Sequence, residues 1–454
     1  MYIRSRREFI KDTLRSVTAL GAVGGLAKFG EMNALAAGSG YQALACVFLL
    51  GGNDGHNTVI PIATAQQPYS QYQQYRGGLA LAQNSLLQIS NGSYVYGLHP
   101  SLVEIQQLYN QGNAAVLANV GMLVQPITRA LYQTNNGALV PAQLFSHSDQ
   151  STQWQTGIAS GNGSTGWGGR ISDLVQNQNS SIFPAVTATS GCQVFCTGAQ
   201  TFPAAVPPPS SGSASATNMA VLSGLQPQTA AGLQQLLSFD NGMQLVQAAN
   251  GILMRGSSYA NTLTSLLANV TLQTQFPANN PLAAQLRTVA NIMAVRNQLG
   301  LSRQIFFCML DGFDTHSAQL ETQGPLLQQL SQAVLAFYNA TKELGIDGSV
   351  TTFTASEFGR TLTPSGADGS DHAWGNHHFI IGTGVKGGQF YGNFPLLAPG
   401  GSSDANSRGT LIPTTAVDQY GSTLAQWFGV APASLPAVFP NIANFGTNKL
   451  GFLG

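Results

Sequence analysis

The feature that most restricts the fold is a continuous apolar run, Ala43 to Leu50, which ends in the glycine-rich turn GGNDG. A strand that is apolar along its whole length is buried on both faces, as in a parallel sheet covered by helices. A second strand is predicted at Gln304 to Leu310, and a third in the segment SVTTFTAS, which runs up to Glu357. We therefore expect a largely buried parallel sheet.

Segments with helical periodicity separate these strands. One helix is predicted from Pro100 to Gly112, before a strand at 114–120, and another from Pro325 to Leu344. Strands that alternate with helices predict a three-layer α/β/α sandwich. Residues from about 185 to 300 include the stretch PPPSSGSASAT and two helical segments, and we predict that they form a mainly helical insertion covering one end of the sheet.

Residues 1–37 are interpreted as an export signal, and residues 38–454 as one domain. The motif SRREFIK precedes a glycine-rich apolar stretch, and the small residues ALA follow at 34–36. This order resembles a twin-arginine signal and predicts export by the twin-arginine machinery to a periplasmic or secreted location; the alternative is an ordinary basic amphipathic helix. No later run reaches about 18 apolar residues, so no permanent membrane span is expected.

Charged residues make up only 8% of the chain, and the formal net charge is zero. A chain this poor in lysine and arginine has no basic surface for phosphate backbones, so nucleic-acid binding is not expected. Cys192 and Cys196, in CQVFC, are close enough to form a disulfide, and zinc binding by this pair is the weaker alternative. Cys46 and Cys308 lie in apolar runs and are expected to be buried thiols.

Ionisable residues gather where the predicted strands end. Asp54 follows the first strand, Asp314 and His316 follow the strand that ends at Leu310, and DHAWGNHH, at 371–378, holds three of the seven histidines. Because the carboxyl ends of parallel strands meet at one edge, these side chains are expected to lie together. Carboxylates and imidazoles suit zinc, manganese or similar divalent metal ions. The predicted metal ligands are Asp54, Asp314, His316, Glu357, His372 and His378.

Several of these residues also have a structural explanation. Asp54 lies in a glycine-rich segment and could stabilise a tight turn, and the DTH motif could cap a helix. Glu357 could pair with Arg360, because a glutamate at a buried strand end needs a partner. His377 and His378 are adjacent, so at most one of them is expected to point toward the site.

Five segments resemble, in order and spacing, an exported bacterial family, the domain of unknown function 1501. They are VFLLGGNDGHNTVIP, SHSDQSTQWQTG, GFDTHSAQ, SEFGRT and DHAWGNHHFIIGTGVKGGQFYG, and the similarity runs from about residue 43 to 395. That family is assigned to the alkaline phosphatase and sulfatase superfamily. The resemblance therefore implies an alkaline phosphatase-like sheet with two divalent metals at its carboxyl edge and a hydroxyl nucleophile at a helix start.

Carried over residue by residue, the resemblance implies roles for all six ligand candidates. Asp54 looks like the ligand that follows the first strand, and Asp314 and His316 look like a pair that binds one metal. Glu357 stands where the superfamily usually has an aspartate. His372 resembles the late histidine ligand, with His378 as a second candidate for that role.

The nucleophile is less clear in this resemblance, because the family has no consistent hydroxyl in this segment. Ser148, in LFSHSDQSTQW, is the favoured nucleophile, since it precedes a predicted helix whose amides could bind an anionic oxygen. A simple helix cap is an equally good explanation of Ser148, and His147 and Asp149 are alternative metal ligands. Arg170, in GWGGR, could contact the ester oxygens, although a structural role is the simpler explanation.

The predicted function is an exported, metal-dependent hydrolase of small phosphate or sulfate esters. Two metals about 4 Å apart would activate a hydroxyl or water and hold the attacking and leaving oxygens. The alternative is a non-catalytic secreted protein of the cell envelope or matrix that keeps the fold, with or without a structural metal, and binds a partner or an envelope polymer. The irregular nucleophile segment and the neutral surface favour the alternative.

Overall fold

The structure is a computed structural model that describes most of the chain after the leader. The described residues are 40–64, 67–134, 137, 139–161, 163–181, 183–191, 193–209, 228–229, 231–232, 235, 244–366 and 368–454. The predicted export signal, residues 1–37, lies outside the described residues, and so does Cys192. Export and the disulfide in CQVFC therefore stay predictions.

A nine-stranded sheet forms the centre of the described part of the chain, in the order β11-β5-β10-β9-β1-β8-β6-β7, with β12 also paired to β5. The strands are β1 (Gln42–Leu49), β5 (Ala114–Gly121), β6 (Val186–Ala188), β7 (Ala204–Ala205), β8 (Arg303–Leu310), β9 (Val350–Ala355), β10 (Asn376–Ile381), β11 (Phe390–Tyr391) and β12 (Thr415–Ala416). β1 lies between β8 and β9 and is parallel to both. β10 is antiparallel to its neighbours β5 and β9, so the sheet is mainly but not wholly parallel.

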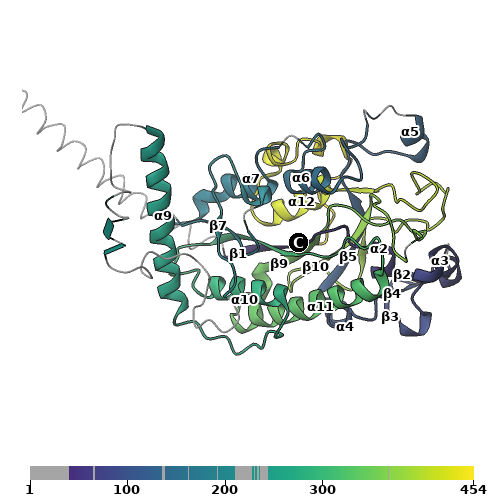
Figure 1. Ribbon diagram of the computed structural model, residues 1–454, viewed down its shortest axis with the longest axis horizontal. Helices are drawn as coiled ribbons and strands as arrows, with labels where there is room; N and C mark the ends of the chain where they lie inside the picture. The colour runs from purple at the N-terminus through teal and green to yellow at the C-terminus, as the bar shows by residue number, and fades with distance from the viewer. Residues whose placement is uncertain are drawn as a thin grey trace, which may run out of the picture.

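Helices cover both faces of this sheet, which confirms the predicted three-layer α/β/α architecture (Figure 1). One layer contains α4 (Val103–Asn110), α10 (Pro281–Ala294) and α11 (Gln319–Glu343); the other contains α6 (His147–Thr156), α7 (Trp167–Val175) and α12 (Val417–Trp427). Alternate side chains of β1 enter two different hydrophobic cores: Val47 packs in the core that includes α10 and α11, and Phe48 in the core that includes α7 and α12.

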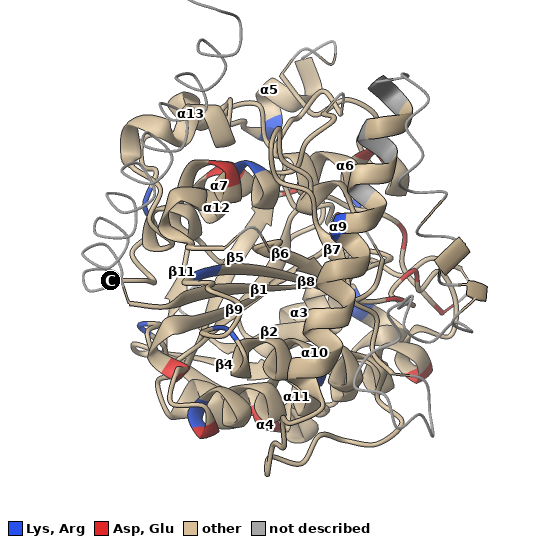
Figure 2. Cartoon of the chain, turned by 90° about the vertical axis from the view of Figure 1, so that its left-hand side faces the viewer, with Lys and Arg blue, Asp and Glu red and all other residues tan. Residues whose placement is uncertain are grey.

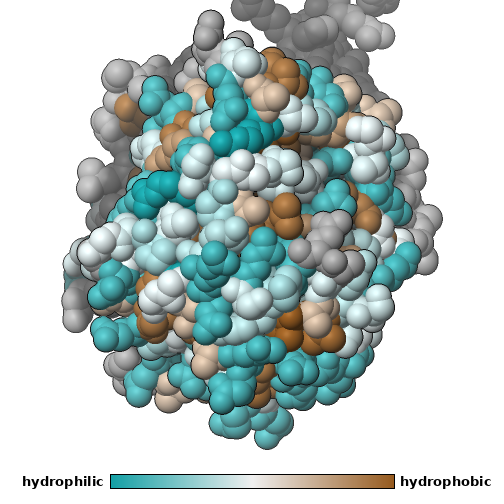
Figure 3. Space-filling model, turned by 90° about the vertical axis from the view of Figure 1, so that its right-hand side faces the viewer, coloured by the Kyte–Doolittle hydropathy of each residue, from teal (hydrophilic) through white to brown (hydrophobic). Residues whose placement is uncertain are grey.

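A smaller antiparallel sheet, β2-β4-β3, lies beside the central one with α2 and α3 (Figure 1). Its strands are β2 (Val59–Ala63), β3 (Leu87–Asn91) and β4 (Tyr94–Leu98), and the helices are α2 (Gly55–Thr58) and α3 (Tyr69–Arg76). The face on this side of the molecule is mostly hydrophilic, with small separate hydrophobic patches (Figure 3).

Residues 185–300, predicted as a mainly helical insertion, contribute strands as well as helices. β6 and β7 extend the sheet beyond β8, α10 packs against α11, and α9 (Gln244–Leu267) lies at this end of the sheet (Figure 1). The described part of the chain also forms the short helices α5 (Arg129–Thr134) and α13 (Leu435–Val438).

α11 begins at Gln319, six residues before the predicted start at Pro325, which lies inside the helix. A proline lacks the backbone N–H and so costs one hydrogen bond inside a helix. The additional first turns are anchored by buried glutamine side chains: Gln319 and Gln323 both donate to Asp54, Gln323 to its carbonyl at 2.9 Å.

Charged residues are few and lie scattered along the chain (Figure 2), and some of them, such as Arg76 and Arg360, are buried. Among the described residues, no helix has the length and apolar character needed to cross a membrane. Cys46 and Cys308 are buried, as expected.

Candidate metal centre

Three histidines and one aspartate converge at the carboxyl edge of the central sheet. Asp314 and His316 lie in the loop after β8, His372 lies in the loop before β10, and His147 is the first residue of α6. The Nε2 atoms of His147, His316 and His372 lie 3.3, 3.2 and 3.4 Å from Oδ1 of Asp314. Ligand atoms of His147, Asp314 and His372 all lie within 4.8 Å of one another, so these residues could hold a metal ion.

The other ring nitrogen of each histidine faces an acceptor. The contacts are His147 Nδ1 to Glu357 Oε1 at 2.9 Å, His316 Nδ1 to Asp371 Oδ1 at 3.3 Å, and His372 Nδ1 to the Phe145 carbonyl at 2.8 Å. Because all three partners accept, the proton of each neutral imidazole belongs on Nδ1, and Nε2 keeps its lone pair. Histidines that bind metals use this arrangement, in which an outer acceptor fixes the tautomer and the ring orientation.

With the protons on Nδ1, the Nε2 lone pairs of the histidines face one another. Nε2 of His316 lies 2.9 Å from Nε2 of His372, and Nε2 of His147 is buried without a hydrogen-bond partner. Lone pairs this close repel unless a proton or a cation lies among them. The donor set, three imidazoles and a carboxylate, suits zinc and other divalent transition metals.

Glu357 is buried, and its position behind His147 is fixed by the backbone. Its Oε1 accepts from the N–H of Gly51 at 2.8 Å as well as from His147. The hydrogen bond that His147 donates to Glu357, with the charges of Glu357 and Asp314, raises the pKa of His147 against the opposing effect of burial. Glu357 therefore orients a candidate ligand from behind, and does not pair with Arg360 as one explanation of the sequence proposed.

Asp314 is held ionised by Arg360. Partial burial favours the neutral acid, but the hydrogen bond and charge of Arg360, with the nearby histidines, lower the pKa of Asp314 to about 2. Arg360 is buried, and its other donors bind the backbone carbonyls of Gly51, Gly52 and Ser370. The carboxylate is thus ionised near neutral pH and available as an anionic ligand.

The glycine-rich turn after β1 brings the backbone close to this loop. Gly51 has φ of +117°, and a Cβ at this position would lie 2.3 Å from the backbone nitrogen of Asp314. Only glycine fits such a close approach without displacing the loop. The turn GGNDG therefore supports the site through its backbone.

Phe358 forms an apolar wall against two of the histidines. Its ring centroid lies 4.7 Å from that of His147 and 4.7 Å from that of His372, and these two imidazoles are 4.2 Å apart. The opposite side is open, because the side chains of Asp314 and His316 are 48% and 46% exposed. A small solute can therefore reach the cluster.

Ser148, the predicted nucleophile, lies next to His147 but belongs to the cap of α6. Its exposed Oγ is 3.2 Å from Oγ of Ser146 and 3.3 Å from Oδ2 of Asp149. Ser146 is the N-cap, and its side chain accepts from the backbone N–H of Asp149. The Asp149 carboxylate in the first turn already complements the positive end of the helix dipole, which weakens this terminus as an anion site.

Asp54, predicted as a ligand, is not brought into the cluster. Its Oδ1 accepts from the N–H of His56 at 3.0 Å, which makes Asp54 the N-cap of α2. Its Oδ2 is bound by Arg76 and by Gln319. Asp54 and Arg76 are both fully buried, so this aspartate serves the structural role that the sequence left open.

His378, also predicted as a ligand, lies on β10 in the hydrophobic core. Its ring packs 5.4 Å from Trp154 and 6.0 Å from Tyr420, and burial lowers its pKa to about 3. His377 points to the other face of the strand and stacks on Phe394. Successive residues of a strand alternate between faces, so neither histidine is directed at the cluster.

Arg170, predicted to contact the ester, is instead bound by backbone carbonyls. Its guanidinium donates to the carbonyls of Thr156, Thr165 and Val438, which ties the end of α6 to α7 and α13. Nothing in these contacts connects Arg170 with the candidate metal centre.

The fold and this cluster define an α/β sandwich protein with a candidate metal centre at the carboxyl edge of its sheet. The model of the family of proteins of unknown function DUF1501 matches residues 41–415, so the chain belongs to this family. A comparison with curated proteins finds no match.

Solved structures with a similar arrangement come from the alkaline phosphatase and sulfatase superfamily. The lipoteichoic acid synthase LtaP from Listeria monocytogenes has a TM-score of 0.36 at 7% identity, over 91% of this chain and 81% of its own. A TAB5 alkaline phosphatase mutant with magnesium bound, from an Antarctic bacterium, has a TM-score of 0.31 at 11% identity, over 76% and 92%. The PsFucS1 sulfatase from Pseudoalteromonas has a TM-score of 0.33 at 10% identity, over 90% and 71%.

Proposed function

We propose that this protein is an exported, metal-dependent hydrolase of small phosphate or sulfate esters whose centre holds a single divalent ion. The ligands would be Nε2 of His147, His316 and His372 and a carboxylate oxygen of Asp314. The observation that carries this proposal is that three imidazoles present their lone pairs to one carboxylate while an outer acceptor holds each Nδ1. A divalent ion, when bound, supplies Lewis acidity toward an ester oxygen.

The residues of this chain would hold the ion in position and leave it accessible to an ester from solvent. Glu357, Asp371 and the Phe145 carbonyl keep the three imidazoles oriented, so little reorganisation is needed when an ion or substrate binds. Phe358 keeps water from one side, while the exposed side admits an ester from solvent. Zinc and manganese are the ions that this donor set favours.

One ion, and not the two implied by the superfamily resemblance, agrees best with the surroundings of Asp54. A second ion would need this carboxylate or an equivalent one, but Arg76, Gln319 and the His56 N–H already bind it. A metal ion bound to Asp54 would displace the Arg76 guanidinium. Arg76 would then be a buried charge without a partner, at a cost of several kcal/mol.

A second function is favoured by the state of the nucleophile segment. Ser148 lies in the cap network of α6, and Arg170 is bound to backbone carbonyls. The same centre could therefore be a structural metal site in a secreted, non-catalytic protein of the cell envelope. The two functions differ only in activity, so metal content and hydrolysis must be measured together.

The test uses the exported protein purified without chelator, with its metal content measured by mass spectrometry and its activity on chromogenic phosphate and sulfate esters. We expect about one equivalent of metal in the natural protein and little in His316→Ala. His99→Asn is the matched control, because His99 lies outside the cluster and accepts from the Ser101 N–H. Metal with hydrolysis supports the enzyme, metal without hydrolysis supports the binding protein, and a metal-free protein contradicts both.

A further inference from the structure

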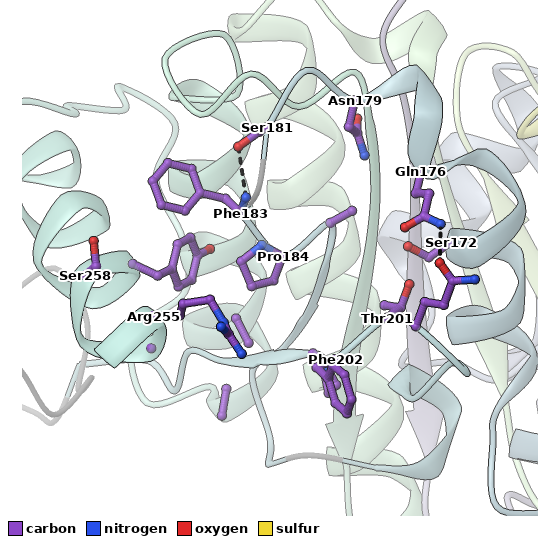
Figure 4. Close-up of a pocket in the computed structure, with 17 residues that line it drawn as sticks. Ser172, Gln176, Asn179, Ser181, Phe183, Pro184, Thr201, Phe202, Arg255 and Ser258 are labelled. Atoms are coloured by element: carbon purple, nitrogen blue, oxygen red, sulfur yellow. Dashed lines mark hydrogen bonds between the residues drawn. The ribbon is translucent and has the colours of Figure 1, made fainter. Parts of the chain in front are cut away.

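A cavity of about 550 Å³ lies between α7, the segment leading into β7, and α9, away from the candidate metal centre. None of its lining residues belongs to the metal centre. Its size is that of a site for a ligand of two or three sugar rings. Figure 4 shows two walls: Gln176, Thr201 and Phe202 on one side, and Ser258, Arg255 and Phe183 on the other.

The cavity offers aromatic surfaces on both walls. Phe202 is 69% exposed, although burying a phenylalanine is strongly favoured in water. On the opposite wall, Phe183 packs on Tyr259 with ring centroids 5.3 Å apart. Exposed aromatic rings at the mouth of a cavity provide flat apolar contacts for a ligand that carries flat apolar faces of its own.

The polar lining consists of amides and hydroxyls. Nε2 of Gln176 donates to Oε1 of Gln200 at 2.8 Å, which leaves Oε1 of Gln176 and the amide nitrogen of Gln200 for a ligand. The hydroxyls of Ser172, Ser181, Ser258 and Thr201 also line the cavity. Such a set of paired donors and acceptors matches a ligand rich in hydroxyl groups.

Arg255 is the one charged residue among those lining the cavity, and no carboxylate lines it. Its guanidinium is exposed and lies across the cavity from Phe202 (Figure 4). A guanidinium binds carboxylate and sulfate groups with two parallel hydrogen bonds. A single cation among neutral groups favours a ligand with one anionic group per few rings.

The wall that carries Phe202 is fixed in position by a carboxylate behind it. Asp173, on α7, accepts from the backbone N–H groups of Ala199 at 2.6 Å, Gln200 at 3.2 Å and Thr201 at 2.7 Å. These charge-assisted bonds hold the segment before β7 in one conformation, so the exposed ring is presented without a large entropic cost on binding.

From these observations we infer that the cavity binds an acidic saccharide, with a sugar face on Phe202, hydroxyls on the Gln176–Gln200 pair, and a carboxylate or sulfate on Arg255. This ligand chemistry could come from a uronate or from a sulfated sugar. The site is independent of the metal centre, and its test does not require activity.

The test is calorimetric titration of the full exported protein with trigalacturonate, with a sulfated disaccharide and with neutral maltotriose. We expect one of the two acidic ligands to bind, at least about tenfold more tightly than maltotriose, which identifies the anionic group. Phe202→Ala should weaken this binding by about tenfold or more, and Arg255→Gln should remove the preference for the acidic ligand. Both positions are exposed, so neither change should impair folding.

Met254→Ala is the matched control, because Met254 is 51% exposed on the same helix as Arg255 and does not line the cavity. It should bind as the natural protein does. Failure of both acidic ligands to bind, equal affinity for maltotriose, or unchanged binding in Phe202→Ala would each overturn the inference. Tighter binding of adenosine monophosphate, which also offers an aromatic face and an anion, would overturn it in favour of a nucleotide.

Discussion

Two neighbouring strands of the sheet are each followed by an aspartate, and the two aspartates have opposite surroundings. Asp54, after β1, has a fully buried side chain and is paired with an equally buried Arg76. Asp314, after β8, is 48% exposed and faces three histidines. At the same edge of the sheet, the Asp54 carboxylate is therefore closed to a ligand, whereas the Asp314 carboxylate is open to one.

The difference lies in whether the neighbours donate or accept hydrogen bonds. Asp54 is surrounded by N–H groups of Arg76, Gln319 and the backbone, so its charge is fully compensated. Asp314 receives Arg360 but otherwise faces imidazole nitrogens whose protons are directed outward. An anion among lone pairs needs a cation, whereas an anion among donors does not.

The largest effect on stability is expected from removing the buried partner of Asp54. Arg76→Met removes the cation and leaves Asp54 as a buried, unpaired charge, which should lower the free energy of unfolding by about 3–5 kcal/mol. Arg408→Gln removes the partner of the partly exposed Asp371 and should cost about 1 kcal/mol or less. Urea denaturation measures both changes, and equal losses in the two variants would contradict the comparison.

A third aspartate, Asp418, is buried among groups that stabilise its charge only partly. Burial raises the pKa of Asp418, on α12, to about 7, with only partial compensation by backbone N–H groups and Arg170. The unfolded carboxyl titrates near its ordinary pKa of 3.8, so the folded state holds the proton over a wider range. The protein should therefore lose stability as pH rises from about 4 to 7, by about 4 kcal/mol, and lose no more from this group above that.

Asp418→Asn keeps the shape of the side chain and removes its titration. Its free energy of unfolding should vary less between pH 5 and pH 8, and at pH 8 it should be more stable than the natural protein. Urea denaturation at the two pH values measures this. A pH dependence that is unchanged in the variant would mean that backbone donors compensate the ionised Asp418 fully.

The parts of the fold that could be predicted from the sequence are those with an unambiguous pattern. β1 and β8 are largely apolar and β9 is rich in β-branched residues; all three are mostly buried, and the structure has them close to the predicted residues. β10 was not predicted, because it begins with Asn376, His377 and His378, which are polar and yet buried. The small antiparallel sheet escaped prediction too, since Pro61 and Gly97 interrupt its strands.

The site could be predicted for those residues that lie in a loop after a strand of the central sheet. Asp314, His316 and His372 meet because loops at the carboxyl ends of parallel strands converge. The binding of Asp54 by Arg76 depends on a contact between α3 and the turn after β1, which no local pattern records. His147 was an alternative ligand in the sequence, and only the fold shows that the start of α6 brings it to Asp314.

The role of the Asp314 charge can be tested with a substitution that removes the charge and keeps the shape of the side chain. Asp314→Asn should weaken zinc binding by about 100-fold, because it removes the anionic ligand while the exposed side chain contributes little to folding. Asp54→Asn should show the reverse, with zinc binding retained per folded molecule and stability reduced. Zinc titration with a competing chelator, beside thermal unfolding, separates the two, and loss of zinc in both variants would place Asp54 in the centre after all.

The smallest effect is expected from the groups behind the histidines. Glu357→Gln keeps an oxygen that can accept from His147 and from the Gly51 N–H, and removes only the charge, so zinc affinity should fall by about tenfold. Asp371→Asn makes the same change behind His316, where the carboxylate is 38% exposed and also bound by Arg408, so its effect should be smaller still. If Glu357→Gln instead abolished zinc binding altogether, this carboxylate would be a direct ligand, as the sequence alone suggested, and the imidazole of His147 would have to turn away from it.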